Sequence, residues 1–233
     1  MVVHYSYQLK FPFGAAFQQC PKYLIMKTLF SQIKKLTCIN SNGLCHECPF
    51  QKECIYYLLS GGHFQKYPGI FIKRSVIEKQ NYINTQILNI DIYFFHSLLP
   101  YEDYIKAFFE PNNLLFEQYY QIISFKKMIL KEGSAFSGTI KVETPLQRVE
   151  DLAIQIEYYN HTYQTTFIIP TEVQWINKNH IVDERYHTMN RVRFQLGGNI
   201  GTMKVNNLDK ALFYIGIGKT NFIGGGTISE IKD

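Results

Sequence analysis

The stretch that decides the fold is residues 216–227, Gly-Ile-Gly-Lys-Thr-Asn-Phe-Ile-Gly-Gly-Gly-Thr, which holds five of the 15 glycines. Glycine is used where the backbone needs positive φ or a close approach. A run of free N–H groups around Lys219 would suit phosphate. Helix-spaced apolar residues precede the stretch, and a strand-like run at 227–231 follows it. This order is neither that of a Walker loop nor that of a Rossmann fingerprint, because both follow a strand and open a helix.

The composition is that of a globular protein. Of 233 residues, 46% are hydrophobic and 18% charged, and the length allows one large domain or two small ones. The net charge of +5 mildly favours a polyanionic partner. The N-terminal residues lack a basic region followed by an apolar core, and no run approaches 18 apolar residues. We therefore expect a cytoplasmic protein that does not enter a membrane.

The first half alternates strands and helices. Residues 2–11 alternate like a strand, and Pro21 opens a helix whose apolar residues recur at helical spacing as far as Leu36. The elements expected next are a turn at Gly61-Gly62, strands at 69–74 and 85–95, a helix from Pro100 and a strand at 119–130. This β-α-β-β-α-β order is ferredoxin-like.

The second half follows the same plan. A boundary after Glu132 would give one domain at 1–132, with a cysteine-bearing insertion at 38–54, and another at 133–233. The expected elements are a strand at 138–143 interrupted by Thr144-Pro145, a helix from Val149 to Tyr159, a strand at 163–169, and a hairpin at 191–205 turning at Gly197-Gly198-Asn199. The closing helix, glycine stretch and strand complete the unit. The sequence thus predicts an α+β fold of tandem ferredoxin-like units with a C-terminal glycine-rich loop.

Four cysteines form the pattern C-x6-C-x2-C-x5-C at Cys38, Cys45, Cys48 and Cys54. In a cytoplasmic protein such spacing suggests a metal rather than disulfides. Four thiolates suit a structural zinc ion, which would organise a loop too polar to fold alone. An iron–sulfur cluster and metal-free thiols are the alternatives.

Basic and aromatic residues alternate at 185–193, Arg-Tyr-His-Thr-Met-Asn-Arg-Val-Arg. This pattern suits a nucleic-acid backbone, and the alternative is an exposed basic edge strand. The sequence contains no H-x3-H, H-E-x2-H or G-x-S-x-G motif, which argues against a histidine metalloenzyme and a nucleophile-elbow hydrolase.

Together these features resemble the repeat-associated mysterious proteins (RAMPs) of CRISPR systems, and specifically the endoribonuclease that processes CRISPR repeat transcripts. The glycine-rich loop of that family is similar to residues 216–226. Its preceding turn is similar to 196–201, and the opening of its second half to Val142-Glu-Thr-Pro-Leu146. The cysteine block, ending at Cys54-Ile-Tyr56, resembles a cysteine-bearing branch of the family.

The resemblance implies cleavage of CRISPR precursor RNA within its repeats without a catalytic metal. A ribose 2′-hydroxyl would attack its own phosphate and leave a 2′,3′-cyclic phosphate, with a base, an acid and a cation assisting. The partners implied are repeat RNA and CRISPR effector subunits, for a monomer or homodimer. The alternatives are a non-catalytic RNA-binding subunit of an effector complex and a zinc-stabilised protein-interaction module.

The catalytic residues do not follow directly from the family, whose members often carry a histidine on or just after the first helix. Here that helix holds no histidine. We rank His46 first and His187 second, with Lys27 or Arg185 stabilising the phosphate and Tyr23 or Tyr186 as an orienting residue. The residues expected to bind RNA are Gly216, Gly218, Lys219, Phe222, Gly224, Gly225, Gly226, Arg191 and Arg193.

Overall fold

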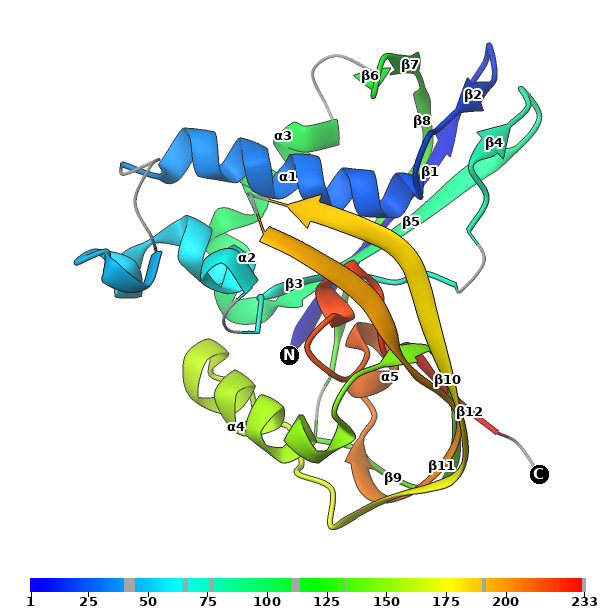
Figure 1. Ribbon diagram of the computed structural model, residues 1–233. Coiled ribbons are helices and arrows are strands. Elements are labelled where there is room, and N and C mark those ends of the chain that lie inside the picture. Colours follow the sequence, from blue (N-terminus) through cyan, green and yellow to red (C-terminus); the bar gives the residue numbers. More distant parts are fainter. Residues whose placement is uncertain are drawn as a thin grey trace.

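The computed structural model shows a mixed α/β fold built on two antiparallel sheets (Figure 1). It describes residues 1–39, 45–64, 67–75, 78–109, 114–131, 133–189 and 192–231. No helix within these ranges is both long and apolar enough to cross a membrane.

The N-terminal sheet has four strands in the order β3-β5-β1-β8. Its strands are β1 (Val2–Lys10), β3 (Ile70–Ile72), β5 (Ile87–Phe95) and β8 (Gln121–Leu130). Its helices are α1 (Pro21–Thr37), α2 (Ile55–Phe64) and α3 (Glu102–Phe109). The expected strands at 2–11, 69–74, 85–95 and 119–130 are confirmed, as are the helices from Pro21 and near Pro100.

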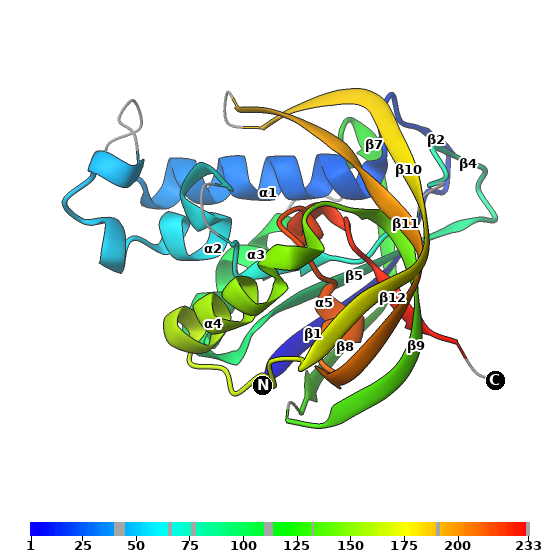
Figure 2. The ribbon, with the colours of Figure 1, turned by 60° about the horizontal axis from the view of Figure 1, so that its bottom comes forward.

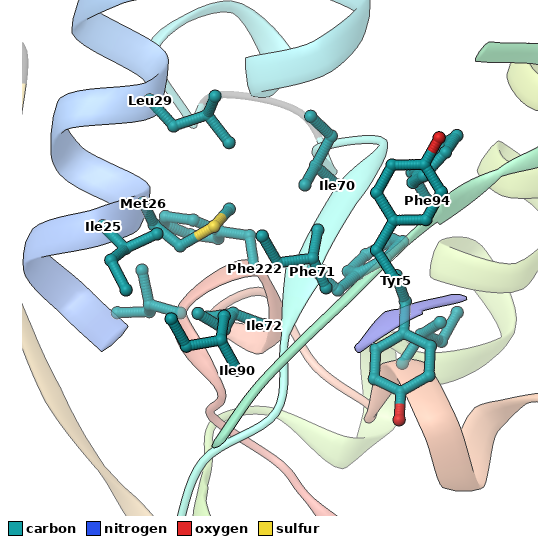
Figure 3. Close-up of a cluster of buried hydrophobic side chains, with 14 of the residues drawn as sticks. Tyr5, Ile25, Met26, Leu29, Ile70, Phe71, Ile72, Ile90, Phe94 and Phe222 are labelled. Atoms are coloured by element: carbon teal, nitrogen blue, oxygen red, sulfur yellow. The ribbon is translucent and has the colours of Figure 1, made fainter. Parts of the chain in front are cut away.

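Helix α1 covers this sheet because its apolar residues form one face. Ile25, Met26 and Leu29 are fully buried, and Figure 3 shows them facing Ile70 and Ile72 of β3. Burying apolar area of this kind is the main favourable term in folding. The helix therefore holds a fixed position relative to the sheet.

The C-terminal sheet has the order β10-β11-β9-β12. Its elements are β9 (Ala135–Leu146), α4 (Leu152–Tyr163), β10 (Glu172–Met189), β11 (Val192–Asp209), α5 (Leu212–Ile215) and β12 (Ile228–Glu230). The 18-residue strands β10 and β11 form a long hairpin whose far end reaches toward α1 in both ribbon views (Figures 1 and 2).

Short elements complete the chain. They are β2 (Ala15–Ala16), β4 (Asn81–Tyr82), β6 (Leu114–Leu115), β7 (Gln118–Tyr119), and the 3-10 turns η1 (Cys45–Glu47), η2 (Gln51–Glu53), η3 (His96–Tyr101), η4 (Val149–Asp151) and η5 (Asn221–Ile223).

Several predictions for the second half are wrong. Residues 164–170 form no strand, because α4 continues to Tyr163. Gly197, Gly198 and Asn199 lie inside β11, paired with residues 180–182 of β10, so they form no turn. Gly198 instead lets β11 approach β9, because a Cβ there would overlap the backbone of Leu146.

Two other pairs of residues that commonly interrupt a strand or helix do not do so here. Thr144-Pro145 does not interrupt its strand, since β9 runs to Leu146. Gly61 and Gly62 lie within α2 rather than forming a separate turn, with φ of +64° and +61°.

The apolar core is shared by both halves of the chain. Phe30 of α1 lies 6.3 Å from Phe222 of the glycine stretch, measured between ring centroids, and Phe95 of β5 stacks on Tyr163 of α4 at 4.5 Å. The halves are thus packed against each other. The expected boundary at residue 132 lies outside the described residues.

Candidate functional site

The glycine-rich stretch connects α5 to β12 and is buried along most of its length. Its N–H groups have partners inside the protein: Gly216 donates to Leu212 O, Ile217 to Gly226 O, Gly224 to Asn221 O, Gly225 to Thr220 O and Gly226 to Pro145 O. The expectation of a run of free amides around Lys219 is therefore wrong for these residues. They are bonded within the fold and cannot cradle a phosphate as they stand.

A buried glutamine ties the stretch to α4. Gln155, with no exposed surface, accepts a hydrogen bond from Gly218 N–H at 2.7 Å and donates to Gly218 O at 3.3 Å. It also donates to the Tyr159 hydroxyl at 2.8 Å, which accepts a second bond from Asn221 Nδ2 at 3.0 Å. This network fixes the backbone immediately before Lys219.

The glycines are needed for packing. At Gly226, where φ is +60°, an added Cβ would overlap the Ile217 carbonyl oxygen. At Gly224, where φ is +81°, it would overlap the side chain of Arg74. These positions exclude side chains because other parts of the protein already fill the space.

Lys219 itself is exposed, at the edge of a groove of about 380 Å³. The groove is lined by Tyr67, Gln147, Arg148, Asp151, Ile154, Tyr158 and Lys219. Arg148 has φ of +49°, a left-handed conformation that is uncommon for a residue other than glycine and that often marks functional positions. Its side chain is 82% exposed. Arg148 was not among the residues that the sequence pointed to. The only sequence signal there was its position between an expected strand and an expected helix.

Burial raises the pKa of both groove tyrosines. For Tyr67 the carboxylate of Asp151 adds to the shift and Arg148 opposes it. Tyr158 shifts in the same direction, although hydrogen bonding to Thr162 opposes burial. Both phenols are therefore neutral at physiological pH, and the groove carries two cations against one carboxylate.

The candidate residues on α1 have different environments. Tyr23 is fully buried in the core and offers no surface to a substrate, which contradicts its predicted orienting role. Lys27, on the same helix, is half-buried and reaches the surface.

The basic candidates lie on the long hairpin. Arg185 and His187 belong to β10 and Arg193 to β11, and their side chains lie outside the described part of the structure, as does Arg191 entirely. The hairpin brings this segment toward α1 (Figures 1 and 2). His46 lies in η1, beyond the C-terminal end of α1, and its side chain is likewise outside the described part.

The four cysteines are half-buried free thiols. Burial, together with the nearby thiols of Cys54 and Cys38, raises the pKa of Cys45 to about 11. The thiols are thus close enough to interact. Among the described residues, however, no group of three His, Cys, Asp or Glu side chains has the geometry of a metal site.

A histidine–carboxylate pair that no sequence pattern indicated lies on the N-terminal sheet. His4 Nε2 lies 2.8 Å from Asp91 Oδ1, and the His4 ring stacks on Tyr93 at 4.4 Å. Burial would raise the pKa of Asp91, but hydrogen bonds with His4 and Ser6 outweigh it and lower that pKa. The residues are 87 apart in sequence, so only strand pairing reveals the contact.

Comparison with known proteins gives no match to a protein-family model and no sufficiently similar curated sequence. Solved structures do match. A Cas6-related protein of Pyrococcus furiosus aligns over 100% of both chains, with a TM-score of 0.57 and 11% identity. The chain has the Cas6/RAMP fold. A RAMP protein described as binding different RNA substrates aligns over 99% of this chain and 100% of its own, with a TM-score of 0.55 and 10% identity. A Cas6b structure aligns over 99% of this chain and 100% of its own, with a TM-score of 0.53 and 15% identity.

Proposed function

We propose that this protein binds CRISPR repeat RNA and cleaves it within the repeat, without a catalytic metal, to release guide RNAs. The observation that carries the proposal is the groove of this Cas6/RAMP fold, where Lys219 and Arg148 project beside two tyrosines. Cations and aromatic rings together suit single-stranded nucleic acid, because cations neutralise phosphates and rings stack on bases.

Cleavage would proceed by attack of a ribose 2′-hydroxyl on the adjacent phosphate, leaving a 2′,3′-cyclic phosphate and a 5′-hydroxyl. A histidine can act as base or acid because its pKa lies near neutrality. His187 and His46 are the proposed proton-transfer residues. Lys27 and Arg185 are the proposed cations for the phosphorane, since they lie on α1 and on the hairpin that reaches toward it.

The architecture fits this role. We propose that the halves divided near residue 132 are tandem ferredoxin-like units, since each sheet places its first strand between its third and fourth. RNA would follow the surface formed by α1, the hairpin and Lys219. We propose a cytoplasmic location and a monomer or homodimer, alone or with effector subunits.

We also propose that the four cysteines hold a structural zinc ion. Thiolates are preferred zinc ligands, and Cys48 N–H donates to Cys45 O at 3.3 Å, which places the two residues in one tight turn. The thiols would have to move together on binding, as in small domains that fold around a metal. An iron–sulfur cluster is the alternative occupant.

Incubation of the purified protein with single-stranded repeat RNA in EDTA tests the catalytic proposal. We expect cleavage at one position and a cyclic-phosphate product. A substrate with a single deoxyribose at the scissile nucleotide should bind equally well and remain intact. Cutting of that substrate would overturn the 2′-hydroxyl mechanism.

The same assay tests the alternative of a non-catalytic RNA-binding subunit. Tight binding of repeat RNA without cleavage would establish it in place of the nuclease. Absence of binding at low salt would reject both, since phosphate contacts are strongest under that condition.

A further inference from the structure

The groove at the start of α4 has the size and chemistry of a site for one nucleotide. We propose that it binds a single unpaired nucleotide of RNA, with the base against Tyr158 and a phosphate between Arg148 and Lys219. This inference rests on the proposed RNA-binding function and assigns a specific subsite to it. The volume of about 380 Å³ lies within the usual range for small-ligand sites.

Lys219 projects from a rigid backbone. Gly218, the preceding residue, uses both its N–H and its carbonyl on Gln155, and a Cβ at Gly218 would lie 2.6 Å from Leu146 Cδ1. The α-carbon of Lys219 is therefore held beside α4 before any ligand arrives. Such preorganisation lowers the conformational cost of binding.

Arg148 supplies the second cation that lines the groove. It lies two residues after the end of strand β9, in a left-handed backbone conformation. Its guanidinium lies 3.9 Å from Asp151 Oδ2, and the two side chains are 82% and 41% exposed. A long and solvated pair of this kind is weak, so the guanidinium remains able to bind a phosphate in bidentate fashion.

The tyrosines supply the stacking surface. The rings of Tyr67 and Tyr158 are 5.7 Å apart between centroids and tilted by 55°, which leaves no room for a base between them. Tyr67 also packs against the buried Tyr159 at 5.8 Å and is held from that side. We therefore assign the base to Tyr158, with Tyr67 supporting its ring.

Two probes test the site: a single-stranded repeat RNA and free uridine monophosphate. The variants are Arg148→Ala, Lys219→Ala, Tyr158→Ala and Tyr158→Phe, with Lys126→Ala on β8 as the matched cation control. Equal thermal melting curves establish that each variant is folded.

We expect Tyr158→Ala to weaken RNA binding about tenfold and Tyr158→Phe to restore it, because stacking needs the ring and not the hydroxyl. Arg148→Ala and Lys219→Ala should each reduce the slope of log K against log salt by about 0.7. The control variant should leave the affinity at the wild-type value, and uridine monophosphate should perturb the NMR signals of Tyr158 in the wild type.

RNA binding of all groove variants at wild-type affinity and salt slope would overturn the nucleotide site while leaving the proposed function intact. Binding of uridine monophosphate, lost in Tyr158→Ala, in a protein that does not bind repeat RNA would keep the site and reject the proposed function. Failure of the wild type to bind either probe would reject both.

Discussion

The glycine-rich stretch and the cysteine segment look equally irregular in sequence, yet their structures differ sharply. Residues 216–227 are buried except for Lys219, and most of their N–H groups, those of all five glycines included, are bonded within the fold. Residues 45–54 contain two 3-10 turns joined by bonds between near neighbours, and their cysteines are half-buried. The first region is held by contacts with α1, β9 and α4, whereas the second packs against the neighbouring helix α2 and, through Cys45 and Cys54, against the edge of the core.

The difference teaches how a segment without regular structure acquires a defined shape. The glycine stretch obtains it from tertiary contacts, because its missing side chains let other elements close around it. The backbone hydrogen bonds described in the cysteine segment join near neighbours, so we expect a bound metal to add a tie between its more distant residues.

The largest expected effect breaks the packed region. Gly226→Ala places a methyl group against the Ile217 carbonyl at φ of +60°. We expect a loss of about 3 kcal/mol or more in the free energy of unfolding, measured by denaturant titration. The control is Gly133→Ala, which has φ of +80° but nothing within 4 Å of the added Cβ, and should cost about 1 kcal/mol. Equal losses in the two variants would show that the contact with Ile217 is unimportant.

The second prediction concerns the cysteine segment. Replacing Cys45 and Cys48 together with Ser should release the bound metal and lower stability by about 2 kcal/mol. Metal content measured by mass spectrometry and thermal melting with and without EDTA provide the test. The matched control is Cys20→Ser, a buried cysteine outside the pattern, which should keep the metal. A wild-type protein purified anaerobically without metal would contradict the zinc proposal.

The third prediction compares the residue that holds the backbone of the glycine stretch, Gln155, with its charged residue, Lys219. Gln155→Leu removes the paired hydrogen bonds to Gly218 and leaves that buried N–H without its partner. The expected loss is about 1–3 kcal/mol of stability. Lys219→Ala should change stability by less than about 0.5 kcal/mol, because this side chain is exposed. If the two losses were equal, Gln155 would not be the anchor that we describe.

The smallest expected effect concerns the ion pairs of Glu102, which lie outside both the glycine stretch and the cysteine segment. Burial would raise the pKa of Glu102, but hydrogen bonds from Lys106, Lys127 and Tyr5 outweigh it and lower that pKa to about 2. The stability that the ionised Glu102 contributes is therefore present at pH values above its ordinary pKa of 4.5, and it is lost as the pH falls toward 2. Glu102→Gln should therefore lower the free energy of unfolding at pH 7. The difference in this free energy between the variant and the wild type should become smaller near pH 2. If the difference in stability between the variant and the wild type did not change with pH, the ion pairs of Glu102 would be excluded as its cause.

The sequence predicted much of the fold and less of the site. Strands β1 and β5 and helix α1 followed from periodicity, because each has one strongly apolar face. Gly197 and Gly198 were misread as a turn, since glycine marks close strand approach as well as reversal. Arg148 was missed because its conformation and its place in the same groove as Lys219 depend on how β9, α4 and the glycine stretch meet.

The sequence by itself determined most of the strands and helices, the cysteine spacing and the position of the glycines, because these depend on residues close together in the chain. Only the tertiary structure decided that the glycine amides are bonded internally and that Lys219 lies beside Arg148 and Tyr158. It also paired His4 with Asp91. The bond between Gly218 and Gln155 joins residues 63 positions apart, and the bond between His4 and Asp91 joins residues 87 positions apart. No local pattern encodes which distant segments will bury the same surface.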